Sequence, residues 1–323
     1  MEEKYYFGNT LQIRGVEEYR LTEGKAAGMR MLQVRNGLGL EVTVSPERCA
    51  DIARVIYKGD NLGYFSPTGH VAPAYYDGVG DGMLRSFTGG FLTTCGLTNV
   101  GVPCEDAGEA LPLHGRISNQ PAEHCWWTEE ADEFVIHAKM RQGAMFQEKL
   151  ELHRRIRIGK KKNQIKIEDC IRNCGEQETP CMILYHMNMG YPLLTEHAKL
   201  TIPSVRVEGR NELAKEYLES WDQIIEPGSM KEEVCYYHSF EKDGFARIYN
   251  PDLKKGVEIR FDAESLNCFV EWKMMGKYDY VLGLEPGNCY PNGRKAERER
   301  GALVTLPEGG EKHYAVEIQI VEE

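Results

Sequence analysis

Apolar and polar residues alternate with a period of two along several stretches of the chain. The clearest stretches, with apolar residues at nearly every second position, are 38–44, 134–140, 150–158, 165–167 and 314–320. Side chains two residues apart lie on the same face of a strand, so each stretch predicts a strand with one buried face. Gly, Pro, Asn and Asp residues separate the stretches, which is typical of antiparallel sheets.

Helical periodicity is scarce. Short helices are predicted at 47–55, directly after Ser45-Pro46, and at 211–218. Strands and helices do not alternate regularly, which disfavours a doubly wound α/β fold. No repeat of roughly 20–50 residues and no low-complexity linker divides the chain. We therefore expect a mainly β protein, a single large antiparallel β-sandwich domain over residues 1–323 with few short helices.

The net charge excludes some classes of partner. The chain has 323 residues and a formal net charge of −11, which argues against a nucleic-acid partner because phosphate binding needs a positive surface. The one basic run, 154–162, is expected to be a solvated hairpin tip. No apolar run reaches the roughly 18 residues that span a bilayer, and the start lacks a signal-peptide pattern. A cytoplasmic protein without a membrane partner is expected.

Cysteines and histidines give weak metal signals. The ten cysteines include no CxxC pair, so we expect reduced thiols, mostly small core residues, and no structural zinc. His114 and His124 are a possible metal pair, but no third ligand stands at a suitable spacing. We expect no metal and no cofactor.

The stretch 280–288 is the first candidate for chemistry. Read as a strand, it places Gly283 and Glu285 on one face and Leu282 and Leu284 on the apolar other face. Glycine in a strand often marks a place where a ligand comes close, so the carboxylate would face open space. The alternative is a structural glutamate that caps a turn or pairs with a basic residue.

The preceding strand contributes a tryptophan. If Gly276–Asp279 is a four-residue hairpin loop, symmetric pairing sets Trp272 opposite Gly283, on the same face as Glu285, while Glu271 faces away. An indole there suits the apolar face of a pyranose. A one-residue slip would move it away, and a core tryptophan is the alternative.

Two further segments carry polar groups beside apolar ones. The glycine-rich segment 75–102 suits the wall of a ligand site, with Arg85 facing a small polar ligand or, alternatively, forming a surface salt bridge. The segment 181–192 reads as a buried strand with His186 and Asn188 on one side. These two side chains suit a sugar's ring oxygen and hydroxyls, although a hydrogen-bonded core histidine is the common alternative.

In their order along the chain, these motifs resemble the aldose 1-epimerase (galactose mutarotase-like) family. The resemblance runs from about residue 35 to the C-terminus and rests on the segments Arg85-Ser-Phe-Thr-Gly89-Gly90, Leu113-His114-Gly115-Arg116, Tyr185-His186-Met-Asn188-Met-Gly190, Glu271-Trp272-Lys273-Met-Met-Gly276 and Gly283-Leu-Glu285-Pro-Gly-Asn288. It implies a β-sandwich with a ligand cleft on a concave sheet face. It also implies that His186 is the general acid and Glu285 the general base.

The resemblance also implies that a histidine and an arginine, here His114 and Arg85, hold the sugar. Together with Asn188, Trp272 and Arg116, these are the expected substrate-binding residues. The chain departs from well-studied mutarotases, which have His-x-Tyr-Phe-Asn-Leu in the motif of His186 and a substrate-holding aspartate later in the chain. We place no counterpart of that aspartate, and Asp222 is not adopted.

The expected function is therefore that of an aldose 1-epimerase-like isomerase. It would interconvert the α and β anomers of a monosaccharide or sugar derivative by acid/base ring opening, as a monomer or homodimer and without a cofactor. The pKa of His186 is expected near neutral. The alternatives are a non-catalytic carbohydrate-binding protein, or a different sugar isomerase, lyase or glycoside-cleaving enzyme.

Overall fold

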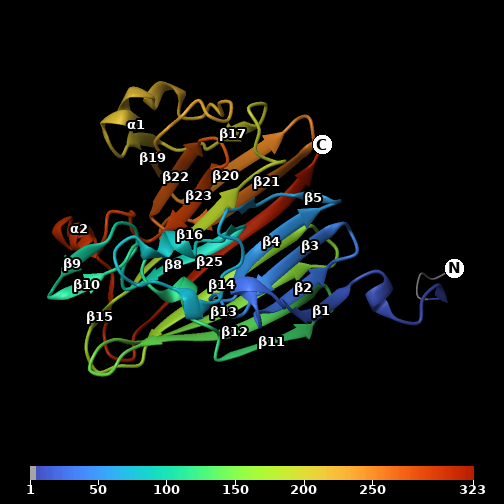
Figure 1. The fold of residues 1–323 in the computed structure, drawn as a ribbon, viewed down its shortest axis with the longest axis horizontal. Helices are drawn as coiled ribbons and strands as arrows, with labels where there is room; N and C mark the ends of the chain where they lie inside the picture. The colour runs from blue at the N-terminus through green and yellow to red at the C-terminus, as the bar shows by residue number, and fades with distance from the viewer. Residues whose placement is uncertain (1–4) are drawn as a thin grey trace.

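The computed structural model describes residues 5–323 and consists mainly of antiparallel strands (Figure 1). The expectation that the chain starts without a signal sequence rests partly on Met1–Lys4, which lie outside the described residues. Within the described chain, no helix is long and apolar enough to cross a bilayer.

Three large sheets make up most of the structure. In spatial order, the five-stranded sheet contains β1 (Gly15–Arg20), β2 (Arg30–Arg35), β3 (Leu40–Ser45), β4 (Asp51–Tyr57) and β5 (Asp60–Asn61). The eight-stranded sheet contains β11 (His124–Glu129), β12 (Glu133–Gly143), β13 (Lys149–Gly159), β14 (Gln164–Asn173), β25 (Glu311–Glu322), β21 (Lys255–Asp262), β20 (Asp243–Asn250) and β17 (Lys199–Thr201). The six-stranded sheet contains β18 (Arg206–Gly209), β19 (Val234–Ser239), β22 (Cys268–Met275), β23 (Tyr280–Gly287), β16 (Met182–Met189) and β8 (Leu92–Leu97).

The remaining elements are short. Three strand pairs are β6 (Tyr64–Phe65) with β7 (Gly89–Gly90), β9 (Cys104–Asp106) with β10 (Glu109–Leu111), and β15 (Thr179–Pro180) with β24 (Thr305–Leu306). The α-helices are α1 (Glu212–Glu216) and α2 (Arg294–Glu299). The 3₁₀ turns are η2 (Thr10–Gln12), η3 (Gly24–Ala26), η4 (Pro73–Tyr75), η5 (Gly82–Arg85), η6 (Ile117–Asn119) and η7 (Leu218–Ser220).

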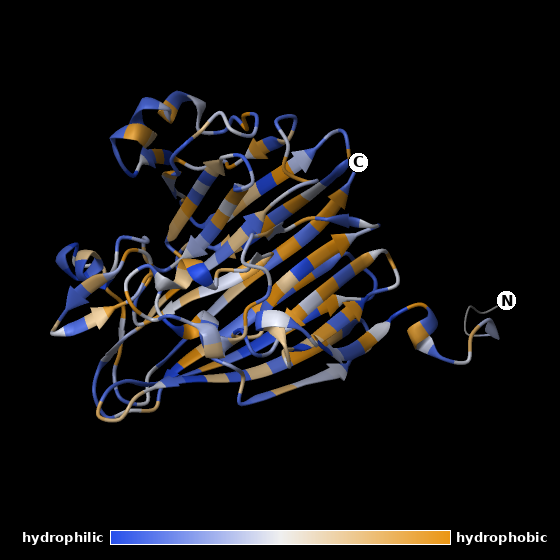
Figure 2. Cartoon of the chain, in the orientation of Figure 1, coloured by the Kyte–Doolittle hydropathy of each residue, from blue (hydrophilic) through white to orange (hydrophobic). Residues whose placement is uncertain are grey.

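The strands follow the hydrophobic pattern of the sequence. Side chains along β12, β13 and β14 alternate between buried and more exposed positions, and Figure 2 shows the same alternation in hydropathy along the sheet. The five stretches predicted from alternation lie in β3, β12, β13, β14 and β25, so these predictions are confirmed. By contrast, β16 is buried along its whole length because it lies inside the six-stranded sheet, between β23 and β8.

One of the two helix predictions is wrong. Segment 47–55 forms a turn followed by β4, because Cys49 and Ala50 adopt positive φ angles of 56° and 50°, which end a right-handed helix. The helix predicted at 211–218 is confirmed as α1. The Asn211 side chain caps it by accepting a hydrogen bond from the Ala214 amide at 2.9 Å.

A large apolar cluster joins the three sheets. Its buried members include Val42 from the five-stranded sheet, Ile156 and Ile318 from the eight-stranded sheet, and Leu282 and Leu284 from the six-stranded sheet. The apolar face predicted for stretch 280–288 therefore packs into the core. Its opposite face, which carries Glu285, turns away from this cluster.

The basic run 154–162 is not uniformly solvated, which corrects the sequence prediction. Lys161 and Lys162 are exposed at the turn between β13 and β14, but Arg154 is 1% exposed. Its guanidinium donates to the carboxylates of Asp169 at 2.9 and 2.7 Å and Asp51 at 2.8 Å. Two further bonds reach the Cys49 carbonyl at 3.2 Å and the Thr94 hydroxyl at 2.8 Å, and these use all of its donors.

This buried arginine connects all three sheets. Asp51 begins β4, Asp169 and Arg154 lie in the eight-stranded sheet, and Thr94 lies in β8 of the six-stranded sheet. The hydroxyl of Tyr185, in β16, donates to Asp169 at 2.9 Å. The network therefore fixes β8 and β16 from the core side.

We predict that Arg154→Met destabilises the protein by about 3–5 kcal/mol, because two buried carboxylates lose their partner. The free energy of unfolding from urea titration measures this loss. Arg155→Met is the matched control, since the neighbouring Arg155 side chain is 54% exposed and pairs with Glu168 on the surface. It is expected to cost about 0–1 kcal/mol. Equal losses in the two variants would contradict a structural role for the buried network.

Candidate active site

The pairing of β16 with β23 determines the centre of the site. Leu184 pairs with Gly287 and Met187 with Leu284, and the same register sets His186 opposite Glu285. On the other side of β23, Trp272 pairs with Gly283, as predicted from the symmetric hairpin. Cross-strand neighbours on one sheet face have Cβ atoms about 4.5–5.5 Å apart, so this register brings the side chains together.

His186 and Glu285 form a close, buried pair. The imidazole Nε2 lies 3.2 Å from Oε1 of Glu285, and the two residues are only 5% and 2% exposed. Oε1 forms no aligned hydrogen bond within the described chain, and the Nδ1 atom of His186 forms none either. Two buried polar groups that face each other without a full set of partners are poised to interact with a ligand.

Glycine at position 283 makes room for the carboxylate. A Cβ atom there would lie 2.2 Å from Oε1 of Glu285 and 3.2 Å from the Cβ of Trp272. Any larger residue would therefore displace the Glu285 side chain. The open space inferred from the sequence is the space that the carboxylate itself occupies.

Burial decides where the proton of this pair resides. Burial lowers the pKa of His186 to about 4, although the Asn188 side chain acts in the opposite direction and favours the charged ring. Burial also raises the pKa of Glu285 well above its ordinary value, with a further contribution from Glu233, while Arg210 lowers it. The expectation of a near-neutral pKa for His186 is thus wrong, because desolvation outweighs its neighbours. These two shifts favour a neutral imidazole beside a protonated carboxyl.

His114 supplies a neutral hydrogen-bond donor. Its Nδ1 accepts a hydrogen bond from the Gly101 amide at 3.3 Å, so the proton of the neutral ring lies on Nε2. Burial, followed by His186 and Arg210, lowers the pKa of His114 to about 3. The next residue must be glycine, since a Cβ at Gly115 would lie 2.2 Å from a backbone oxygen.

Aromatic rings surround His186. The ring centroids of Phe87, His114 and Trp272 lie 5.4, 5.5 and 5.2 Å from that of His186, all in edge-on arrangements. The indole nitrogen of Trp272 donates to a carboxylate oxygen of Glu233 at 2.7 Å, which fixes the plane of the indole. The imidazole therefore lies in a low-dielectric, sterically defined position.

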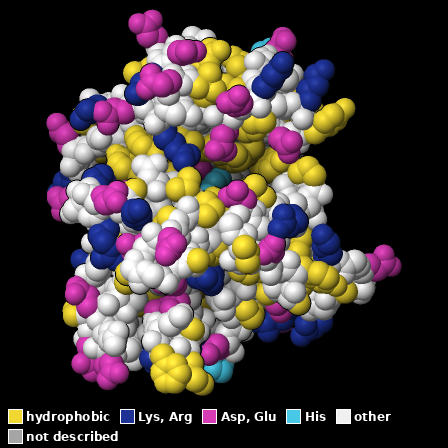
Figure 3. Space-filling view, turned by 60° about the vertical axis from the view of Figure 1, so that its left-hand side comes forward, with side chains coloured by type: hydrophobic (Ala, Val, Ile, Leu, Met, Phe, Trp, Pro, Cys, Tyr) yellow, Lys and Arg dark blue, Asp and Glu magenta, His cyan; other side chains and the backbone are white. Residues whose placement is uncertain are grey.

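These residues line a cavity of about 400 Å³, within the roughly 300–1,000 Å³ typical of small-molecule sites. The connection between β6 and β7 forms one wall with Met83, Leu84 and Phe87. Val102 and Leu113, from the long connection after β8, line the cavity as well. The space-filling view in Figure 3 shows a hollow with a histidine at its bottom and charged side chains around it. The glycine-rich segment thus forms a wall of the cavity, as its composition predicted.

Arg210 is the cation of the cavity. It follows β18, and its side chain forms one hydrogen bond within the described chain, to the sulfur of Cys235 at 3.7 Å. No ion pair joins it to a carboxylate of residues 5–323. By contrast, the buried arginines Arg154 and Arg294 form ion pairs with aspartates. Arg210 thus retains donors for a ligand.

Several residues predicted from sequence do not line the cavity. Arg85 is 70% exposed and pairs with Asp77, and Arg116 pairs with Glu109 at 3.8 Å. Asn188 is fully buried beside His186, where it donates to the carbonyls of Gly89 and His186 at 3.2 and 3.0 Å. Asn188 therefore holds the strand rather than facing the ligand space.

His124 and Asp222 are exposed and lie outside the lining of the cavity. The sequence interpretation missed three charged lining residues, Asp81, Arg210 and Glu233. Arg210 and Glu233 stand at the ends of short, irregular strands, where no periodic pattern marks them.

The raised pKa of Glu285 predicts a stability cost that depends on pH. Folding favours the protonated carboxyl, so the folded protein loses stability as pH rises above the ordinary glutamate pKa of about 4.3 toward the raised folded value. Glu285→Gln mimics the protonated form and does not titrate. We therefore expect this variant to be more stable than wild type near pH 7, with the difference vanishing below about pH 4.

Urea unfolding at a series of pH values measures the difference. The titration of His186 is common to both proteins and largely cancels in the comparison. Glu226→Gln, an exposed surface substitution, controls for the change in net charge. A stability difference independent of pH would show that the carboxyl of Glu285 is not desolvated as described.

Several solved structures have the same fold as this chain. A Klebsiella pneumoniae protein provisionally described as an aldose 1-epimerase is 25% identical, with 98% of this chain and 87% of that chain covered and a TM-score of 0.90. A galactose mutarotase-like protein from Clostridium acetobutylicum is 14% identical, with coverage of 97% and 100% and a TM-score of 0.72. For galactose 1-epimerase from Lactobacillus acidophilus the identity is 12%, the coverage 96% and 99%, and the TM-score 0.60.

These likenesses confirm the mainly β, galactose mutarotase-like fold and the resemblance noted from the motifs. No curated protein matches the sequence. The model of the family described as a domain of unknown function (DUF4432) matches residues 26–320, and the chain therefore belongs to that family.

Proposed function

We propose that this protein is an aldose 1-epimerase-like isomerase that interconverts the α and β anomers of a monosaccharide or sugar derivative. One observation carries the proposal: a histidine and a glutamate face each other at 3.2 Å, both buried, in a cavity of about 400 Å³. Anomer exchange requires only that one group removes a proton while another supplies one. A pair that holds a single proton between two partners meets this requirement.

The proposed reaction starts with the proton on Glu285. Transfer to His186 across 3.2 Å gives a carboxylate and an imidazolium, and Arg210, which lowers the pKa of Glu285, favours the carboxylate. Glu285 then takes the proton of the anomeric hydroxyl while His186 protonates the ring oxygen. The ring opens, the C1–C2 bond rotates, and closure on the other aldehyde face reverses both transfers.

Other residues of the cavity would orient the sugar. The sugar's hydroxyl oxygens can accept hydrogen bonds from Nε2–H of His114 and from the free donors of Arg210. The carboxylate of Glu233, at the rim, can accept a hydrogen bond from a sugar hydroxyl. The indole of Trp272, held by Glu233, offers an apolar ring face. Orientation of the reacting atoms is a large part of such a rate enhancement.

One competing reaction has support from the structure. Glu233 and Glu285 both line the cavity, and glycosidases use two carboxyl groups. Glu271, the other glutamate considered from sequence, is excluded from such a pair because it is buried on the opposite sheet face with His238 and Lys273. The close imidazole partner of Glu285 favours anomer exchange over glycoside cleavage. A protein that binds a sugar without a reaction is the remaining alternative.

We predict that Glu285→Gln and His186→Asn each lower kcat/KM for anomer exchange by about 10²–10⁴-fold, because each removes a proton-transfer group. Exchange NMR of the α and β anomeric signals across a panel of aldoses, aldose phosphates and uronic acids measures the rate. Calorimetric titration of the same sugars measures binding in parallel. Asp222→Asn, an exposed change outside the cavity, is the control and should keep the wild-type rate.

The same panel separates the alternatives. A sugar that binds wild type without faster anomer exchange would contradict the isomerase and favour a binding protein. Release of nitrophenol from nitrophenyl glycosides, abolished by Glu233→Gln, would instead favour glycoside cleavage.

A further inference from the structure

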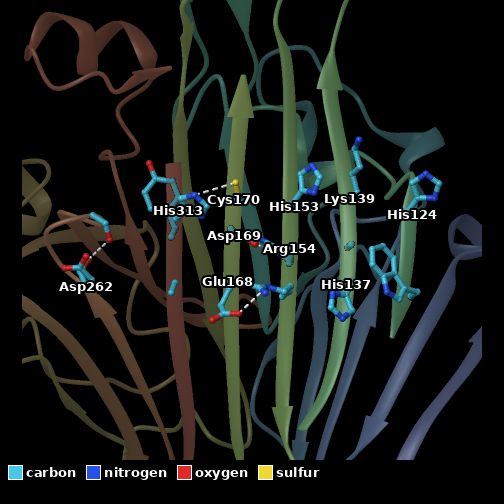
Figure 4. A pocket seen from close by; sticks show the side chains of 16 residues that line it. His124, His137, Lys139, His153, Arg154, Glu168, Asp169, Cys170, Asp262 and His313 are labelled. Carbon is cyan, nitrogen blue, oxygen red and sulfur yellow. Dashed lines mark hydrogen bonds and ion pairs between the residues drawn. The ribbon is translucent and has the colours of Figure 1, made fainter. Parts of the chain in front are cut away.

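A second group of reactive side chains lies on the outer face of the eight-stranded sheet. There, the pairing of three central strands places His153 of β13 opposite Cys170 of β14, and Cys170 opposite His313 of β25. Glu311, two residues before His313, lies on the same face. Figure 4 shows this face, with Cys170 between His153 and His313. It belongs to a different sheet from the His186–Glu285 cavity.

Three donor atoms already lie close together. The Cys170 sulfur is 4.0 Å from Nε2 of His313 and 3.9 Å from a carboxylate oxygen of Glu311, and Nε2 is 3.1 Å from the other oxygen of Glu311. A tetrahedral zinc ion, with bonds of about 2.3 Å to sulfur and about 2.0–2.1 Å to nitrogen and oxygen, sets donor separations of about 3.3–3.6 Å. The observed distances differ from these by at most about half an ångström, which small side-chain rotations remove.

From this geometry we propose that Cys170, His313 and Glu311 form a zinc-binding site. Thiolate, imidazole and carboxylate are the donor types that zinc takes in proteins, whereas a thiolate is a poor ligand for magnesium or calcium. Side chains on central strands also keep their spacing better than side chains on loops. The site is open, since Glu311 and His313 are exposed and Cys170 is partly exposed.

His153 is positioned to supply a fourth ligand. Its imidazole, 50% exposed, now contacts a carboxylate oxygen of Glu151 at 3.1 Å, and the cross-strand register places it beside Cys170. When the His153 side chain rotates away from Glu151, it loses one surface contact and gains a bond to the metal. Water completes the coordination where His153 stays with Glu151.

A bound ion would cross-link distant parts of the chain. Cys170 is 141 residues from Glu311 and 143 from His313, so the ion joins the C-terminal strand to the middle of the sheet. A ligand that binds only the folded state raises its stability, and a cross-link over a long loop adds to this effect. Zinc is thus expected to stabilise the folded protein without taking part in the chemistry of the cavity.

The test is thermal unfolding of the reduced full-length protein, freed of metal by chelator, with and without added Zn²⁺. We expect zinc to raise Tm for wild type and to leave Tm of Cys170→Ser and His313→Ala unchanged. The matched controls, Cys174→Ser and His197→Ala, should respond like wild type, since Cys174 is exposed outside the site and His197 is paired with Asp252.

Cobalt gives an independent readout of the ligands. One equivalent of Co²⁺ should produce the near-ultraviolet charge-transfer absorption of a cobalt–thiolate bond in wild type and Cys174→Ser, but not in Cys170→Ser. His153→Ala should weaken binding less than His313→Ala does. Zinc stabilisation that persists in Cys170→Ser, or an absent cobalt–thiolate band in wild type, would show an adventitious ion only and overturn the proposal. Neither result depends on whether the cavity is an isomerase.

Discussion

The buried guanidinium of Arg154 is the interaction on which the arrangement of the three sheets depends. Its donors are all used, by two aspartates, a threonine and a backbone carbonyl, so its charge is tolerated in the core. Through Thr94 and Tyr185 it holds β8 and β16 from inside the molecule. Because successive residues of a strand point to opposite faces, fixing Tyr185 toward the core turns His186 outward into the cavity.

The cavity depends in turn on the register of β16, β23 and β22. A shift of one residue would turn Glu285 into the core and Leu284 into the cavity. Burial against this sheet raises the pKa of Glu285, so the proton of the pair resides on its carboxyl. The desolvated pair is thus destabilising for the fold, and under the proposed function the same desolvation serves proton transfer.

Much of the fold could be predicted from sequence, because period-two alternation reports a half-buried strand directly. Trp272 and Glu285 could be placed on one face because the hairpin loop between their strands is short. The helix predicted at 47–55 is wrong because the positive φ angles at Cys49 and Ala50 leave no trace in the hydrophobic pattern. The glycine-rich surroundings of Arg85 allow either a ligand-binding cation or a surface salt bridge, and the structure shows the salt bridge, to Asp77. Arg210 and the donors around Cys170 depend on contacts between distant segments, which no local pattern encodes.

The central claim is that a desolvated His186 and Glu285 share one proton and move it on a sugar. The pH dependence of kcat/KM for anomer exchange tests it most directly, with the most rapidly exchanged aldose as substrate. We predict a plateau through neutral pH and an acidic limb centred at about pH 4, where the neutral His186 ring takes up a second proton. An acidic limb near the ordinary histidine value of about 6.5, or no acceleration of any sugar at any pH, would contradict it.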